Sequence, residues 1–178
     1  MTSSILLLRS IESHDLVGVM NIAKHMPTRN IIYSGALDAA VTSEDIDILE
    51  YILDHIKLDD LDNVHEDINP VFTAIKYTCY NSYKYLVKRY GVSVDDLEYS
   101  LKYCSQESKI IEYILLQPSL PTFTPRTIYW SVVNKCLYIL DKLLQHPKYK
   151  YDEEEMRVLL RIAPNERIVQ HLLHSIKT

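Results

Sequence analysis

Two lysine–tyrosine pairs are the side chains of this sequence best suited to bind another molecule. Lys76-Tyr77 and Lys102-Tyr103 each place an ammonium group directly before an aromatic ring, and Trp130 is the only tryptophan. Exposed aromatic rings with nearby cations are frequent at the energetic centre of protein–protein interfaces. The same side chains can also stack on nucleobases and contact phosphates. The residue types alone therefore leave a protein and a single-stranded nucleic acid open as partners.

An acidic stretch is the second candidate for binding. Residues 44–67 contain ten carboxylates and a single base, Lys57. We expect Asp59, Asp60 and Asp62 to lie in a loop between helices, where they could steer a basic partner. The plainer interpretation is a helix face and loop that only keep the protein hydrated. Paired catalytic carboxylates would need a shared cleft, and this spread of acids does not predict one.

Nothing in the sequence predicts chemistry that makes or breaks bonds. With three glycines the chain has no glycine-rich phosphate loop, and no G-x-S-x-G nucleophile elbow occurs. No serine or cysteine stands in a readable pattern with a base that would activate it. His171 and His174 are three residues apart, but no cysteine or acid follows to complete a metal site. We predict a protein that is not an enzyme and holds no cofactor or metal.

Composition and charge point to a globular protein outside the membrane. The apolar fraction is 47% and the charged fraction 24%, which is enough for a packed core under a polar surface. The net charge of −5 argues against a phosphate backbone as the main partner. No apolar stretch approaches 18 residues, the N-terminus has no signal-peptide pattern, and the three cysteines suggest no disulfide framework. We expect the cytosol or the nucleus, and no membrane partner.

The candidate residues fall within a unit that recurs along the chain. The segments "AVTSEDIDILEYIL" (40–53), "AIKYTCYNSYKYLV" (74–87) and "SVVNKCLYILDKLL" (131–144) share a small–aliphatic start, a short polar turn and then a helical apolar period. A second string, clearest as "NPVFTA" (69–74), has copies beginning at residues 5, 35, 69, 95, 126 and 154. Two short helices at a spacing of roughly 30 residues predict an all-α solenoid of about six stacked helix–turn–helix repeats. Residues 1–178 would then form a single repeat domain.

These strings resemble the ankyrin repeat, whose unit of about 33 residues starts T-P-L-H-x-A and contains a helix pair and a β-turn. Residues 69–74 match that start, with proline second, an aliphatic residue third and alanine sixth. The chain departs from the family at the inter-helix turn, where the usual glycine is missing and Glu44, Thr78 and Lys135 stand there or nearby. The glycine and aspartate of the hairpin tips are also mostly absent. We therefore expect short or irregular loops in several repeats.

The resemblance also implies a binding role. Ankyrin-repeat proteins bind partners through the end of the first helix and the loop tips, and the first of these positions corresponds to Lys76-Tyr77 and Lys102-Tyr103. A chain this small and divergent is similar to ankyrin-like proteins of large DNA viruses that engage host factors and interfere with host defence. The resemblance thus implies a protein partner in the host cytosol or nucleus, bound without catalysis.

The repeat register predicts which side chains are buried. Tyr80 and Tyr83 take inward positions between repeats, while Tyr85 is expected to be half-buried. The outward side of the same helix carries Lys84, Lys88 and Arg89. Further inward positions are Leu86 and Val87, then Leu6, Leu7, Leu8, Ile11, Leu16 and Val19 in the first unit, and Ile168, Val169, Leu172, Leu173 and Ile176 in the last.

The three cysteines recur near the inter-helix turns. Cys79, Cys104 and Cys136 fall at equivalent or neighbouring positions of three units. Stacked helices are about 8–10 Å apart, so thiolates on this ladder could not converge on one zinc ion or pair as disulfides. We expect all three to be buried or half-buried small hydrophobic residues.

These patterns together predict a protein–protein interaction module. The expected contact residues are Lys76, Tyr77, Lys102, Tyr103 and Trp130, with Asp59, Asp60 and Asp62 in the acidic loop. Two alternatives stay open: a single-stranded nucleic-acid binder that uses the same lysines and tyrosines, and a structural repeat that assembles through the ends of its stack. We expect a monomer or a weak homo-oligomer.

Overall fold

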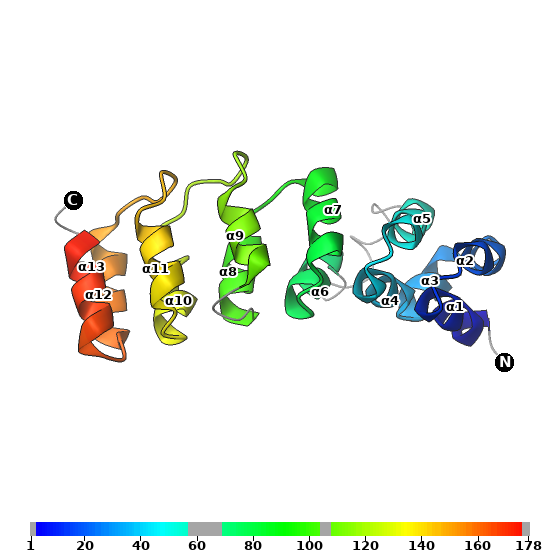
Figure 1. The fold of residues 1–178 in the computed structure, drawn as a ribbon, viewed down its shortest axis with the longest axis horizontal. Helices are drawn as coiled ribbons and strands as arrows, with labels where there is room; N and C mark the ends of the chain where they lie inside the picture. Colours follow the sequence, from blue (N-terminus) through cyan, green and yellow to red (C-terminus); the bar gives the residue numbers. More distant parts are fainter. Residues whose placement is uncertain (1–2, 57–68, 104–107, 176–178) are drawn as a thin grey trace. The chain divides into compact units, whose positions relative to one another are not determined.

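The chain is helical wherever its structure is described. The computed structural model describes residues 3–56, 69–103 and 108–175, and this part contains thirteen helices and no strand (Figure 1). The all-α prediction is therefore confirmed. None of these helices is both long and apolar enough to cross a bilayer.

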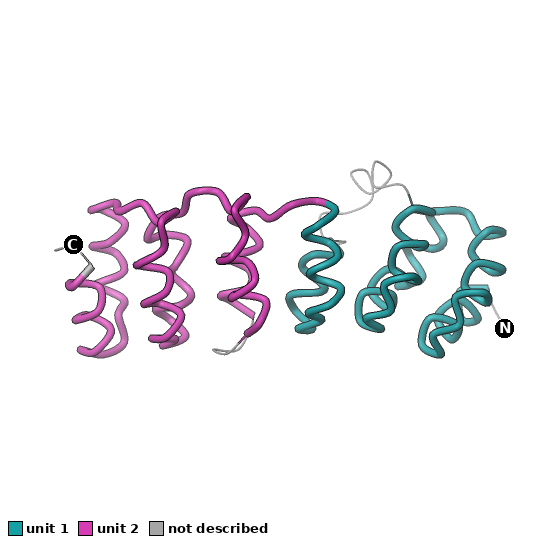
Figure 2. The backbone as a smooth tube through the Cα atoms, turned by 45° about the horizontal axis from the view of Figure 1, so that its top comes forward, with its two compact units in different colours: residues 1–89 teal, residues 90–178 magenta. Residues whose placement is uncertain are grey.

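The helices form two compact units, residues 1–89 and residues 90–178 (Figure 2). The helices of the first unit are α1 (Ser3–Glu12), α2 (Leu16–Ala23), α3 (Thr28–Tyr33), α4 (Ala36–Ser43), α5 (Ile46–Ile56), α6 (Pro70–Lys76) and α7 (Tyr80–Tyr90), the last of which ends at the boundary. Those of the second unit are α8 (Val94–Tyr103), α9 (Lys109–Leu115), α10 (Tyr129–Val133), α11 (Leu137–Leu144), α12 (Glu153–Ile162) and α13 (Glu166–Ser175).

Helices in equivalent places of successive pairs pack together in the first unit. Helix α4 contacts both α1 and α6, while α5 contacts α2. Helix α3 is an addition that the repeat pattern does not predict, and it packs on α4 and α5 after Pro27. The buried positions of α5 follow the period of an amphipathic helix. The fully buried apolar core consists of Leu7, Ile11, Val19, Ala23, Ile31, Ala36, Ala40, Val41, Ile48, Leu49, Ile52, Ala74, Ile75, Tyr83 and Leu86.

The second unit repeats this mode of packing. Helix α10 contacts both α8 and α12, and α13 contacts both α11 and α12. The contacts of α10 make α8, α10 and α12 a row of neighbouring first helices, and this row bears the candidate site. The fully buried core beneath it consists of Leu97, Ile114, Ile128, Val132, Leu140, Leu143, Ile168 and Leu172.

Two loops of the second unit are joined through Phe123. The Phe123 N–H donates to the Lys148 carbonyl oxygen at 3.0 Å, and the Phe123 carbonyl oxygen accepts from the Lys150 N–H at 2.7 Å. These bonds form an isolated parallel bridge opposite Tyr149, and the Phe123 ring, which is buried, packs between His146 and Tyr149. The loop before α10 is thereby held against the loop before α12.

Four inter-helix turns place a non-glycine residue in the left-handed region. The φ angle is 56° at His14, 55° at Glu44, 58° at Thr78 and 59° at Lys135. In three of these turns the following residue donates its N–H, at 2.9 Å, to the carbonyl oxygen five positions earlier, joining Asp15 to Ser10, Cys79 to Ala74 and Cys136 to Ser131. This is the Schellman arrangement, which usually has glycine at the left-handed position. Each bulkier residue raises the free energy of the turn by about 1–2 kcal/mol.

Burial follows the predicted register at most positions. The inward residues Tyr83, Leu86 and Val87 are buried, Tyr85 is half-buried as predicted, and Lys84, Lys88 and Arg89 are exposed. Tyr80, predicted to be inward, is only half-buried. The prediction of burial was wrong for two leucines, since Leu6 is 42% exposed and Leu173 is 44% exposed. Both lie on helices at the end of a unit, where the described chain supplies no further helix to cover the outer face. Ile176 lies outside the described residues.

Two of the cysteines are buried, as predicted. Cys79 and Cys136 are each 7% exposed and form no disulfide. Burial raises the thiol pKa at both positions, and at Cys79 the nearby Glu44 carboxylate raises it further. Because the thiolate is the reactive form, these residues behave as small core side chains. Cys104 lies outside the described residues.

Candidate functional site

The predicted pair Lys76-Tyr77 lies at the end of α6 in the first unit. Tyr77 is the C-cap residue of this helix, its side chain is 56% exposed, and the Lys76 Nζ atom lies 5.5 Å from the centre of its ring. A cation above an exposed aromatic ring contributes about 0.5–1 kcal/mol. The pair therefore presents a partly ordered aromatic surface to solvent.

The predicted pair Lys102-Tyr103 ends α8 and belongs to a larger group in the second unit. The Lys102 Nζ atom lies 4.9 Å from the ring centre of Tyr103 and 5.3 Å from that of Trp130. The Tyr99 ring, one turn earlier on α8, lies 4.4 Å from the Tyr103 ring. We call Tyr99, Lys102, Tyr103 and Trp130 the aromatic cluster. The structure thus brings the predicted pair Lys102-Tyr103 together with Trp130, which was predicted separately, and Tyr103 remains 44% exposed.

Trp130 belongs to the aromatic cluster and also lines a groove. Its side chain is half-buried on α10 and meets the Tyr129 ring edge-to-face, with 5.2 Å between ring centres and an interplanar angle of 87°. Edge-to-face pairs hold both rings in defined orientations. The two rings therefore form a fixed aromatic wall.

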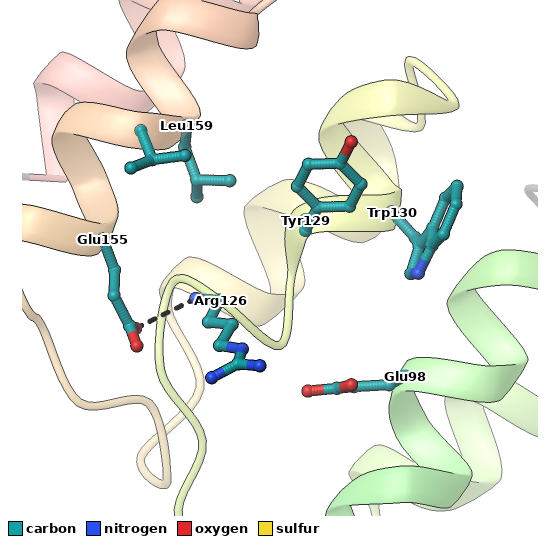
Figure 3. Close-up of a pocket in the computed structure, with 7 residues that line it drawn as sticks. Glu98, Arg126, Tyr129, Trp130, Glu155 and Leu159 are labelled. Atoms are coloured by element: carbon teal, nitrogen blue, oxygen red, sulfur yellow. Dashed lines mark hydrogen bonds between the residues drawn. The ribbon is translucent and has the colours of Figure 1, made fainter.

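This groove has a volume of about 470 Å³ and lies over α8, α10 and α12 (Figure 3). Its apolar lining comes from Tyr129, Trp130, Val158 and Leu159. Its charged lining comes from Glu98, Arg126 and Glu155. A groove of this size, with apolar walls and a few charged groups, suits part of a ligand better than a flat contact surface does.

Glu155 is held in place by the fold. The Asp152 side chain caps α12 by accepting from the Glu155 N–H at 2.9 Å. The Glu155 Oε2 atom then accepts from the Arg126 backbone N–H at 3.1 Å, as Figure 3 shows. The loop before α10 and the first turn of α12 are therefore joined at the rim of the groove.

Glu98 faces the same groove from α8. Burial raises the pKa of the Glu98 carboxyl, and the negative charges of Asp95 and Glu155 raise it further. A hydrogen bond with the Thr127 hydroxyl and the charge of Arg126 act in the opposite direction without cancelling the rise. The ionised carboxylate of Glu98 is thus poorly compensated in the groove.

The aromatic cluster and the groove provide contact area and charge, which suits the binding of another molecule. The aromatic rings supply stiff apolar surface with few rotatable bonds, and the carboxylates and Arg126 supply polar recognition at its edge. Within residues 3–56, 69–103 and 108–175 no group of three or more histidine, cysteine or acidic side chains is arranged to hold a metal ion.

Some predicted site residues lie outside the described part of the chain, and some residues of the groove were not predicted. Asp59, Asp60 and Asp62 lie outside the described residues, so their role stays a prediction. Sequence reasoning missed the groove residues Glu98, Arg126, Tyr129 and Glu155. Glu98 and Tyr129 share the fourth position of the start string, whereas Arg126 and Glu155 take its first and second positions. The positions and residue types are mixed, so no single repeated residue marks the groove.

Comparison with known proteins adds no relative. No family model matches this chain, and neither a curated protein nor a solved structure matches it.

Proposed function

We propose that this chain is a non-enzymatic protein–protein interaction module, built as a solenoid of about six ankyrin-like helix pairs. The alternation of first-helix and second-helix contacts within each unit supports the architecture. The resemblance to ankyrin-like proteins of large DNA viruses extends the proposal to a host protein as the partner, met in the cytosol or the nucleus.

One observation carries the proposal, namely the aromatic cluster with its exposed Tyr103. Lys102 lies over the rings of both Tyr103 and Trp130, so the three side chains are pre-ordered before a partner arrives. Pre-ordered aromatic side chains lose little conformational entropy on binding, and tyrosine and tryptophan dominate interface energetics. The exposed Lys76-Tyr77 pair of the first unit supplies a second, smaller surface with a lysine over a tyrosine ring.

The same geometry favours a protein over a single-stranded nucleic acid. Base stacking needs an accessible ring face, and Lys102 already lies over Tyr103 and Trp130. The net charge of −5 also opposes attraction of a phosphate backbone.

The test is affinity capture with the full chain, followed by measurement of Kd for each captured protein. Tyr103→Ala should weaken binding at least about tenfold, since central aromatic contacts are commonly worth more than 1 kcal/mol. Tyr33→Ala is the matched control, because Tyr33 is 54% exposed and has Arg29 5.5 Å from its ring centre, but lies outside the aromatic cluster.

The outcomes separate the possible functions. Equal loss of binding in both variants, or none in either, would remove the aromatic cluster from the proposal. Capture of single-stranded oligonucleotides with a strong salt dependence would favour the nucleic-acid binder. A molecular mass that rises with protein concentration, without any captured partner, would favour self-assembly.

A further inference from the structure

The charges that line the groove do not balance. Two carboxylates, from Glu98 and Glu155, face one guanidinium, from Arg126. Figure 3 shows the Arg126 side chain directed toward Glu98, while Glu155 is directed at the Arg126 backbone. One negative charge therefore remains in the groove without a cationic counterpart among its lining residues.

Apolar surface borders this negative charge. Val158 is 51% exposed and Tyr129 is 37% exposed, and both line the groove beside Trp130. A side chain that fits such a site has an apolar stem and a cationic end. Lysine and arginine have this form, and they bury their methylene groups along apolar surface while the charged end reaches a polar partner.

Other classes of occupant fit less well. An anionic group would meet Glu98 and Glu155 and be repelled. A purely apolar group would bury the surplus negative charge of the groove without supplying a cation, and burying uncompensated charge is costly. The pKa of Glu98 is raised, first by burial, because Thr127 and Arg126 only partly offset the cost of its charge.

We propose that the groove formed by Glu98, Tyr129, Trp130, Glu155 and Val158 receives a lysine or arginine side chain from a basic, partly apolar segment of a protein partner. The stem packs against Trp130, Tyr129 and Val158, and the cationic end lies between the carboxylates of Glu98 and Glu155. This inference rests on the proposed function, because it gives the chemistry of the partner in protein binding. Arg126 competes with the incoming cation.

The single tryptophan makes the groove observable in the unmodified protein. Trp130 lines the groove, so its fluorescence reports occupancy when the full chain is titrated with a peptide. The probe is a tryptophan-free peptide of alternating leucine and lysine. Its two controls have the same length and carry acetyl-lysine or glutamate in place of lysine. We expect a saturable change in Trp130 emission with the lysine peptide and at least tenfold weaker binding of both controls.

Variants of the charged lining locate the binding site. Glu98→Gln and Glu155→Gln should each weaken binding of the lysine peptide about three- to tenfold, and the amide oxygen that Glu155→Gln introduces can still accept from the Arg126 N–H. Arg126→Gln should tighten binding, because it removes the competing cation. Glu154→Gln is the matched control on α12, since Glu154 is exposed and does not line the groove, and it should change Kd less than twofold. Thermal unfolding of each variant checks that it is folded.

The proposal is overturned if the lysine peptide produces no saturable change, if acetylation leaves its Kd unchanged, or if the Glu98 and Glu155 variants bind like Glu154→Gln. Failure here is distinguishable from failure of the proposed function. If Tyr103→Ala loses captured partners while Glu98→Gln and Glu155→Gln keep them, the protein-binding function stands and the cationic occupant of the groove is wrong.

Discussion

The side chain of Glu44 caps a helix that begins far along the chain. Glu44 lies in the turn between α4 and α5, and its Oε1 atom accepts from the backbone N–H of Asn81, in the first turn of α7, at 2.9 Å. The first N–H groups of a helix have no partner within the helix. One helix pair of the first unit thus supplies a hydrogen-bond acceptor to the first turn of the next.

Removal of this cap should destabilise the protein. Glu44→Ala is expected to lower the free energy of unfolding by about 1 kcal/mol, as loss of a side-chain cap commonly does. Glu44→Gln keeps an oxygen acceptor and should lose less. Urea unfolding followed by circular dichroism measures both variants, and equal losses would show that the acceptor bond to Asn81 contributes little.

The left-handed turns predict a stabilising substitution. Thr78 has φ of 58°, is exposed and is branched at Cβ, which makes this conformation especially unfavourable. Thr78→Gly should therefore raise the free energy of unfolding by about 1 kcal/mol, even though glycine also favours the unfolded chain. Thermal unfolding provides the measurement.

The control for this substitution is another exposed threonine. Thr42 lies inside α4, where glycine is unfavourable, so Thr42→Gly should lower stability by roughly 0.5–1 kcal/mol. If both glycine variants shift stability in the same direction, the backbone conformation at residue 78 is not the cause.

Asp96 predicts a specific dependence of stability on pH. It forms a reciprocal capping box with Ser93 at the start of α8 and is 7% exposed. Burial raises the pKa of its carboxyl above the ordinary value, and the charge of Asp95 adds to the rise, although hydrogen bonds to the carboxyl from the Ser93 backbone N–H and hydroxyl lower the pKa. The folded state therefore binds this proton more tightly than the unfolded state. The contribution of Asp96 to stability falls as the pH rises through the ordinary pKa and the raised pKa, and then stays constant.

Asp96→Asn isolates this effect, because the amide oxygen can still accept from the Ser93 N–H. We compare the free energy of unfolding of the variant with that of the wild type at each pH. The variant should gain stability relative to the wild type when the pH is raised from below the ordinary carboxyl pKa to pH 7. Denaturant unfolding at the two pH values measures the difference. Asp95→Asn, at an exposed neighbour in the same turn, is the control. A difference between wild type and Asp96→Asn that is the same at both pH values would contradict the prediction.

The buried register was predictable from the sequence, because apolar periodicity follows directly from helix geometry. Tyr83, Leu86 and Val87 are buried, and the repeat alignment assigns all three to inward positions. Leu173 was misassigned, since periodicity identifies an apolar face but does not tell whether another helix covers it. Helix α3 was missed because it falls outside the repeated strings.

The candidate site was predictable only where the repeat itself carried the residues. Lys102, Tyr103 and Trp130 stood out by type and register, and the structure places them in contact. Glu98 and Glu155 come from different helices, and only the packing of α8, α10 and α12 brings them to one groove. A single sequence carries no sign of that convergence.

The two backbone bonds of Phe123 have a mechanical consequence. They tie residue 123 to residues 148 and 150, so α10 and α11 lie within a loop of chain that is closed by hydrogen bonds. When the protein is stretched from its two ends, tension reaches the enclosed residues only after these bonds break. The segment that carries Trp130 is therefore shielded from pulling force, and its unravelling should follow rupture of the bridge as a separate event in a force–extension trace.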